Sequence, residues 1–421
     1  MNTTSPYNDA PSISDTKRHA WFFIAMLAAL MALTSLSTDV YLPAMPQMQI
    51  DLQADVELTI TGFLIGFALA QLAWGPVSDR IGRRRPLVVG MGLFVLGSAG
   101  CALSTSIGQI VFWRVVQAMG ACTGPMLARA MVRDLYGRTA AARMLSTLTM
   151  IMAIAPIIAP LMGGQILRLN NWHGIFWLLA GVGALLLLML AWLPETRGPK
   201  HRLHTPLRAA FADYARLVRI RAFMLPTLCV TFFYMGVYAF IAGSPEVYIR
   251  HFGVEPQAYG WLFGINIIGV MLLSFANRTL VQRFSLNALL RTSAAIAAAA
   301  MVMGMALATT ASVTLLAVVL PILVCFSMNG IIAASAMAAA LDEVPEVAGS
   351  ASALIGALQY GSGIVPSALL AWLGDGTPRT MVWIMGISVL LSAAMAFIPA
   401  TRRGEDGVTE ATPASPCEHR A

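Results

Sequence analysis

The chain has 421 residues, of which 58% are hydrophobic and 11% are charged. A soluble protein of this length could not bury that much apolar surface, so the composition excludes an ordinary soluble domain. The formal net charge is +7, but the basic residues lie in short segments between apolar runs. There they set the orientation of a membrane protein, and we expect no nucleic-acid partner.

Residue usage also argues against catalysis and metal binding. The cysteines lack the spacing of a zinc site or a disulfide framework, and the histidines are scattered. Neither Lys17 nor Lys200 ends a glycine-rich nucleotide loop, and the HExxH, GxSxG and CxxC patterns are absent from the sequence. We therefore expect a protein that is not an enzyme and has no metal or cofactor. Any transport would draw on an ion gradient rather than on ATP.

Apolar runs long enough to cross a bilayer follow a polar N-terminal segment, and the first run is too long for a signal peptide. Six runs, a polar linker and six more runs predict an all-α membrane protein with twelve transmembrane helices in two bundles. The first six runs are 21–43, 58–78, 87–105, 107–128, 143–167 and 174–193, and the second six are 222–244, 259–280, 288–309, 311–340, 347–373 and 380–399. The predicted parts are an N-terminal tail (1–20), a first bundle (21–193), a linker (194–221), a second bundle (222–400) and a disordered polar tail (401–421).

The basic residues predict the orientation of these spans. Arg114 lies within a span, and only Arg168, Arg250 and Arg379 fall in the loops opposite the termini. Positive charge gathers on the cytoplasmic side, so both termini should be cytoplasmic. The linker is basic and has the apolar spacing of a short surface helix, so we expect it to lie along the anionic inner leaflet.

The loop after the second span carries the most specific motif, G-P-V-S-D-R-I-G-R-R-R-P-L at residues 75–87. It resembles the signature loop of the major facilitator superfamily, G-x-x-x-D-R-x-G-R-R. The resemblance implies a major facilitator fold and a cytoplasmic latch between its two halves, with the start of span eleven as partner. The alternative is a basic membrane anchor with an incidental acid. The motif residues are Gly75, Asp79, Arg80, Gly82 and Arg83.

Span four contains a fixed charge, Arg114, in the run V-F-W-R-V-V-Q-A-M-G at residues 111–120. Arginine at the centre of a membrane helix costs about 2.5 to 3.5 kcal/mol on insertion scales, so it should face a polar cavity. The run resembles the span-four motif of the same family, R-x-x-Q-G-x-G, with Ala118 at the first glycine. Gln117 lies one turn from Arg114 on the same face. The alternative is an arginine that only locks two helices together.

Span five contains A-P-I-I-A-P-L-M-G-G at residues 155–164. Small residues at four-residue spacing let helices approach closely, and the prolines bend the helix. The run is similar to the antiporter motif G-x-x-x-G-P-x-x-G-G, with alanines at two glycine positions. Helix packing alone is the alternative. The motif residues are Pro156, Pro160, Gly163 and Gly164.

Span one ends in L-S-T-D-V-Y-L-P-A-M-P at residues 36–46, which closely resembles the bicyclomycin and chloramphenicol resistance branch of the drug:proton antiporters. Further matches lie at 131–136, 171–177, 244–245 and 349–353, so the resemblance covers residues 20 to 400. It implies a multi-pass antiporter of the bacterial inner membrane.

Asp39 is the only acid within the first span. A carboxyl group can gain and lose a proton during a transport cycle, whereas arginine stays charged, so we predict that Asp39 and Arg114 couple proton entry to substrate exit. Counting about 1.5 Å per residue from Trp21 places Asp39 roughly 27 Å along the helix. The alternative is therefore an interfacial capping residue, unless the span continues past Pro43. Glu246 is the next candidate for the proton carrier.

Polar and aromatic residues within other spans are candidates for the substrate cavity. Tyr234 and Tyr238, four apart on one face of span seven, are the best pair for an amphipathic drug. Each residue taken alone could instead be a helix-packing contact. The candidates are Gln117, Tyr234, Tyr238, Asn266, Asn329 and Gln359.

These observations predict a monomeric, proton-coupled antiporter that exports small drug-like molecules of the chloramphenicol or bicyclomycin type by alternating access around a central cavity. Such an activity would give multidrug efflux and antibiotic resistance. One alternative is export of a metabolite such as an amino acid or a sugar, which needs more fixed polar groups in the cavity. The alternative from another functional class is a membrane receptor or scaffold that transports nothing. Such a protein would have little reason to retain costly charges inside the membrane.

Overall fold

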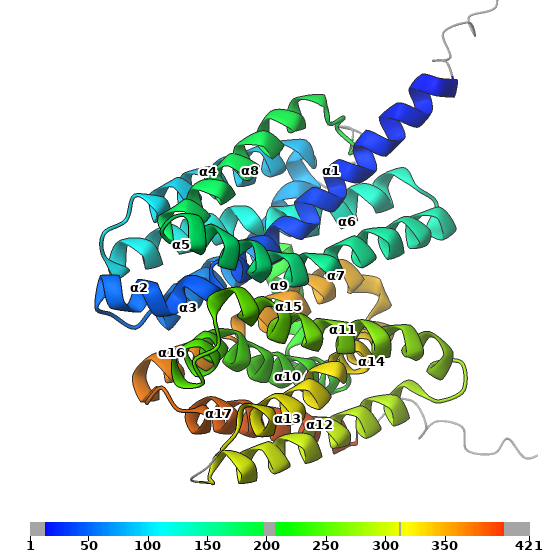
Figure 1. The fold of residues 1–421 in the computed structure, drawn as a ribbon. Helices are drawn as coiled ribbons and strands as arrows, with labels where there is room; N and C mark the ends of the chain where they lie inside the picture. The colour runs from blue at the N-terminus through cyan, green and yellow to red at the C-terminus, as the bar shows by residue number, and fades with distance from the viewer. Residues whose placement is uncertain (1–12, 198–206, 311–312, 400–421) are drawn as a thin grey trace, which may run out of the picture.

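The computed structural model describes residues 13–197, 207–310 and 313–399, and within these ranges all regular structure is helical (Figure 1). Twelve helices of the described chain are long and apolar enough to cross a membrane. They coincide with the twelve predicted runs, so the predicted fold class is confirmed. The predicted disordered tail, 401–421, lies outside the described residues.

The first half of the chain forms six spans. Its first span is longer than predicted, because α1, the short turn η1 and α2 continue one another past Pro43 as a single apolar segment, Phe22–Leu52. Proline fixes the backbone of the turn without ending the span. The elements are α1 (Ile13–Asp39), η1 (Leu42–Ala44), α2 (Met45–Leu52), α3 (Glu57–Ile81), α4 (Arg84–Ala102), α5 (Ile107–Ala121), α6 (Thr123–Leu135), α7 (Arg138–Leu169), α8 (His173–Met189) and η2 (Leu190–Trp192).

The second half also forms six spans, and some of them are interrupted by short non-helical segments. Span ten is divided at Met328 and span eleven at Ser362–Gly363. Irregular backbone is tolerated at membrane depth where protein covers it. The elements are α9 (Leu207–Leu217), α10 (Arg221–Pro245), the π-helical turn η4 (Glu246–His251), α11 (Pro256–Leu280), α12 (Leu286–Ala308), α13 (Leu315–Ser327), α14 (Asn329–Asp342), η5 (Pro345–Val347), α15 (Ala348–Gly361), α16 (Ile364–Leu373) and α17 (Pro378–Phe397).

The spans of each half pack mainly against one another, and Figure 1 shows the blue-to-green helices above the green-to-red ones. Two seams join the halves: α3 lies against α15 and α16, and α7 lies against α11. Large apolar side chains such as Leu169, Phe275 and Trp372 are exposed on the outside of the molecule. A water-soluble surface would not carry so many, whereas lipid covers them without cost.

Candidate functional site

Arg114 lies in a pocket of its own within the first half. Its side chain is 1% exposed, and its guanidinium lies 4.5 Å from the ring centre of Tyr41 and 4.4 Å from that of Phe63. The Nη1 atom donates to Gln117 Oε1 at 2.6 Å and to the carbonyl oxygen of Ser37 at 2.9 Å. Two aromatic faces and two acceptors therefore hold the buried charge in one position.

Gln117 extends this pocket toward α4. Its Nε2 donates to Ser98 Oγ at 2.8 Å, and Ser98 Oγ donates in turn to the carbonyl oxygen of Phe94 at 2.7 Å. The predicted spacing of Arg114 and Gln117 therefore brings them together. Sequence reasoning missed Tyr41, Phe63 and Ser98, because they come from other helices and no local spacing joins them to Arg114.

Asp39 is the last residue of α1 and is only 4% exposed. Because the first span continues to Leu52, Asp39 lies inside the span rather than at its outer end. It forms no ion pair with any residue in the described ranges, including Arg114. The arginine instead contacts the backbone of Ser37, two residues earlier. The structure thus brings Arg114 to the backbone two residues before Asp39, without an ion pair between the two predicted coupling residues.

The span-five motif packs against the segment that follows Asp39. A side chain at Gly163 would overlap the carbonyl oxygen of Val40, so α7 approaches η1 through this glycine. Gly164 faces the start of α11, where a Cβ atom would lie 2.8 Å from the carbonyl oxygen of Pro256. Pro156 and Pro160 both lie inside α7. The motif therefore lies where Asp39, the first half and the second half meet.

Aromatic rings form a chain across the seam between α3 and α15. Phe67 of α3 stacks on Tyr360 of α15 at 3.9 Å between ring centres, and Tyr360 lies 6.2 Å from Tyr238. Tyr238 lies 6.3 Å from Tyr234, as its four-residue spacing predicts. These rings bring α3 into contact with α15 and α10 in this conformation.

Buried amide side chains lie in both halves. Asn329 Nδ2 donates to Tyr234 Oη at 3.5 Å, and Gln359 lies beside the same hydroxyl. Buried amide oxygens of Gln71, Asn266 and Asn329 have no hydrogen-bond partner in the described residues. Buried polar atoms are normally satisfied, so these oxygens are free to receive a ligand or water.

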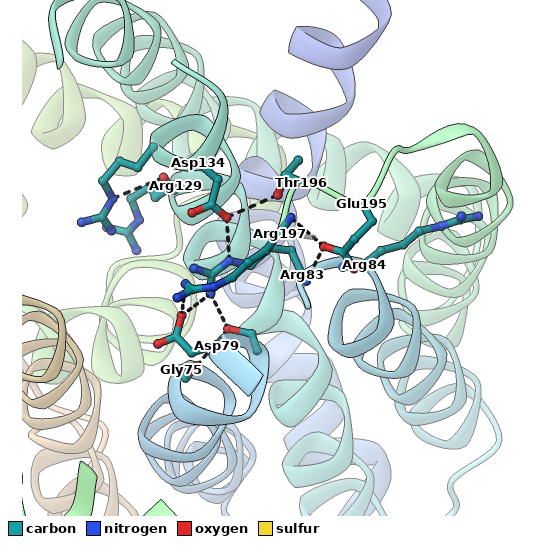
Figure 2. A network of polar contacts seen from close by, with 11 residues as sticks. Gly75, Asp79, Arg83, Arg84, Arg129, Asp134, Glu195, Thr196 and Arg197 are labelled. Carbon is teal, nitrogen blue, oxygen red and sulfur yellow. Dashed lines mark hydrogen bonds and ion pairs between the residues drawn. The ribbon is translucent and has the colours of Figure 1, made fainter. Parts of the chain in front are cut away.

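The loop after span two forms an ion-pair network at the end of the molecule that we call the inner end, following the predicted orientation (Figure 2). Arg83 contacts Asp79 at 2.8 Å and Asp134 of α6 at 2.9 Å. Asp79 also contacts Arg197 at 2.7 Å. Burial alone would lower the pKa of Arg83, but the hydrogen bond to Asp134 and the charge of Asp79 outweigh it and raise that pKa.

Glu195 completes the network from the end of span six. Its carboxylate accepts hydrogen bonds from the backbone nitrogens of Arg83 at 2.8 Å and Arg84 at 3.2 Å, and so caps α4 (Figure 2). Gly82 has φ +97°, and a side chain there would overlap this carboxylate. Sequence reasoning missed Glu195. Its position directly after the last apolar residues of span six could have indicated a charged residue at the inner end of the molecule.

The remaining motif residues differ in what they contact. The carbonyl oxygen of Gly75 accepts from Ser78 Oγ at 2.9 Å, and Ser78 Oγ also accepts from Arg83. Arg80 is half-buried and makes no hydrogen bond or ion pair with the described residues. The partners of Asp79 are thus Arg83 and Arg197, rather than a side chain at the start of span eleven.

The linker helix α9 makes the contact with span eleven. Its Asp213 accepts from Ser350 Oγ of α15 at 3.4 Å, and its Tyr214 Oη donates to the carbonyl oxygen of Leu72 of α3 at 3.3 Å. Burial raises the pKa of Tyr214 to about 12, so the hydroxyl stays protonated and can donate. The helix expected along the leaflet therefore also bridges the two halves at the inner end.

At the opposite, outer end the halves are joined as well. Thr61 Oγ1 of α3 lies 2.8 Å from Ser367 Oγ of α16. The turn η1 packs against α10 and α11. The first seam, where α3 lies against α15 and α16, is therefore joined at the outer end by Thr61 and Ser367 and at the inner end by α9.

Comparisons with known proteins agree with this architecture. The family described as "Major Facilitator Superfamily" matches residues 27–367 and 227–416. An uncharacterized MFS-type transporter of Bacillus subtilis is 35% identical over 393 residues, covering 90% of this chain and 95% of that protein. The bicyclomycin resistance protein homolog of Haemophilus influenzae is 29% identical and covers 92% and 98%. Multidrug resistance protein D of Escherichia coli is 29% identical and covers 91% and 97%.

Among solved structures, the D-xylose-proton symporter superposes with a TM-score of 0.72 at 16% identity, covering 91% of this chain and 99% of that one. That likeness supports the fold alone. The relatives fit the predicted bicyclomycin and chloramphenicol resistance branch, and with the twelve apolar helices they identify a multi-pass protein of the bacterial inner membrane. This chain belongs to the major facilitator superfamily.

Proposed function

We propose that this transporter is a proton-coupled antiporter that exports small drug-like molecules, of the chloramphenicol or bicyclomycin type, by alternating access. The observation that carries the proposal is Asp39, a buried carboxyl group without an ion-pair partner among the described residues, close to a fixed buried arginine. Relatives named as bicyclomycin and multidrug resistance proteins support it.

Asp39 and Arg114 differ in what they can do during a cycle. Arginine keeps its proton at any physiological pH, so Arg114 supplies a constant positive charge. Asp39 can be neutral or negative, and its protonation changes the charge that a substrate meets next to that arginine. Binding of a proton and of a substrate are then linked, which is the basis of exchange.

The aromatic chain and the free amide oxygens supply the proposed substrate contacts. Tyr234, Tyr238 and Tyr360 present rings across the seam, and opening of the seam would expose them to the inner or outer side in turn. Aromatic faces bind flat, apolar or cationic molecules of many shapes. Export of varied drugs needs such tolerance more than it needs fixed polar contacts.

Export of a polar metabolite is the second candidate function. The free oxygens of Gln71, Asn266 and Asn329 favour it, because acceptors left open in a buried site suit a substrate rich in hydroxyl or amine donors. Drug and metabolite export therefore differ in which group of residues binds the substrate, the rings or the amides.

Proteoliposomes with a pH-sensitive dye inside test the proposal. Addition of chloramphenicol to the parent protein should change the internal pH, and collapse of the proton gradient should stop chloramphenicol accumulation. Asp39→Asn should abolish the pH change while chloramphenicol binding, measured by calorimetry, persists within a few-fold. An amino acid or sugar that drives the pH change when chloramphenicol does not would favour the metabolite function.

The matched control is Asp342→Asn, which removes an exposed carboxyl group at the inner end of α14. It should exchange protons like the parent. If Asp39→Asn releases protons as the parent does, another residue carries the proton, and Glu246 is the next to test.

We also propose that the network around Asp79 is a cytoplasmic latch: by holding Arg197 at the start of the linker, it helps to keep α9 in place across the two halves and so favours the conformation closed at the inner end. Asp79→Asn removes the charge that both Arg83 and Arg197 contact. Pairs at this level of exposure contribute about 1 kcal/mol or less each, so the inward and outward populations should shift by about fivefold. Accessibility labelling of inner-end cysteines would measure this shift. Equal populations in Asp79→Asn and the parent would refute the latch.

A further inference from the structure

A small cavity that Asp39 does not line lies at the outer end, between the two halves. Its volume is about 20 Å³, which is room for one water. Glu57, the first residue of α3, lines it from the first half. Glu246 of η4 and Asp375 of the loop before α17 line it from the second half. Three acids from separate parts of the chain thus face one cavity.

Glu57 differs from the other two acids in having no side-chain partner among the described residues; its carboxylate is bonded only to its own backbone. Glu57 is 7% exposed, and its carboxylate makes no hydrogen bond or ion pair with a side chain in the described ranges. Glu246 Oε1, in contrast, accepts from Arg250 at 2.8 Å. Asp375 Oδ1 accepts from the backbone and the hydroxyl of Thr377 and from Thr380.

The charged surroundings of Glu57 are mainly negative. Asp55 precedes it in the chain, and the charges of Asp55 and Glu246 both act on it. Arg250 is bound to Glu246, with its side chain 60% exposed on the outside. The other residues that line the cavity, from α10, η4, α16, α17 and the loop before α17, carry no titratable group. The start of a helix favours a negative charge, but burial and two like charges oppose it.

Closure of the outer end places Glu57 in this position. Thr61, one turn further along α3, is bonded to Ser367 across the same seam. When α3 separates from η4 and from the loop before α17, Glu57 meets external water and can ionise freely. When they close, an ionised Glu57 would lie buried opposite Glu246, whereas a neutral Glu57 would not oppose closure.

We propose that Glu57 is a second proton-binding site, open to the external solution, and that its protonation permits the outer end to close. One proton from the external solution adds to the carboxylate on closing and leaves it on opening. This inference rests on the proposed proton-coupled exchange. It gives external acidity a direct effect on the outward-to-inward step, apart from the proton carried by Asp39.

Spin labels across the outer end test the inference without any transport. Leu103 of the first half and Thr310 of the second are exposed at this end. Both would be changed to cysteine in a Cys417→Ser background. In the parent, the distance between the labels should increase as the pH rises from about 5 to about 9. Glu57→Gln should hold the short distance at every pH, and Glu57→Asp should keep the dependence on pH.

Glu246→Gln is the opposing control, because it removes the facing charge and keeps Glu57. It should lower the midpoint of the transition by about one pH unit, the size of effect that a neighbouring charge has on a carboxyl group. If Glu246→Gln abolishes the pH dependence and Glu57→Gln only shifts it, Glu246 is the proton site. A parent distance that does not change with pH overturns the inference.

Proton exchange driven by chloramphenicol, measured on the same proteoliposomes, separates this inference from the proposed function. Exchange in the parent together with an unchanged pH transition in Glu57→Gln refutes only the Glu57 site. A pH transition that Glu57→Gln removes, in a parent that exchanges no protons for chloramphenicol, refutes only the proposed function.

Discussion

The pocket around Arg114 and the aromatic region around Tyr238 lie on either side of one seam and are built in opposite ways. In the first, charged and polar groups are matched with partners from the first half. In the second, rings from both halves touch, and the amide oxygens nearby are left free. A fully satisfied site holds one geometry, whereas a partly satisfied one can adapt to different ligands. The difference suggests that the first half fixes the coupling charge and the seam adapts to the substrate.

Replacement of Arg114 should have the largest effect. Arg114→Lys keeps the charge but loses the planar group that contacts Gln117 and Ser37 while lying against Tyr41 and Phe63. We expect transport to fall by more than tenfold and the detergent-solubilised protein to lose about 1.5 to 3 kcal/mol of stability, the range for a hydrogen bond to a charged group. Thermal unfolding and drug export measure the two effects.

Gln117→Glu is the matched comparison for Arg114→Lys, because it keeps the side-chain oxygen that accepts the hydrogen bond from Arg114. It should be milder than Arg114→Lys in both measurements. Similar losses in the two variants, or wild-type stability of Arg114→Lys, would contradict the idea of a rigid, fully matched pocket.

Tyr238→Ala should have an intermediate effect, confined to the substrate. Tyr238 lies between the rings of Tyr234 and Tyr360. Its removal would take away one aromatic contact with the substrate, worth about 0.5 to 1.5 kcal/mol, so apparent affinities should change by about two- to tenfold. The change should differ between drugs, because an adaptable surface loses different contacts with each. A panel of resistance measurements would show it, with Tyr238→Phe as control. A uniform loss for all drugs together with lost proton exchange would place Tyr238 in the coupling machinery instead.

Asp375 should show the smallest effect, because hydrogen bonds from Thr377 and Thr380 of the second half already satisfy its carboxylate. Burial acts to raise its pKa, but hydrogen bonds from Thr377 and Thr380 outweigh it and lower that pKa below the usual value. The stabilisation is therefore present at neutral pH and is lost as the pH falls through the lowered pKa. Asp375→Asn should slightly lower the melting temperature at pH 7, and this difference should be smaller near pH 3. Equal differences at both pH values would contradict the assignment.

The apolar periodicity and the local motifs determined much of this protein without any tertiary information. Twelve runs fixed the spans, because the bilayer sets a length that only continuous apolar helices satisfy. Residues close in sequence were also predicted correctly as neighbours: Arg114 with Gln117, and Tyr234 with Tyr238. A helix places residues three or four apart on one face, so spacing alone brings such pairs together.

Only the tertiary structure decided which helices meet and therefore which distant residues share a site. Tyr41 and Phe63 lie against Arg114 and Ser98 binds Gln117, each from a different part of the chain, and Glu195 reaches the start of α4 from more than a hundred residues away. The stack of Phe67 on Tyr360 and the cavity beside Glu57 exist only where the two halves touch. Local spacing carries no information about such contacts, because they depend on how whole helices pack and on which conformation of the seam is formed.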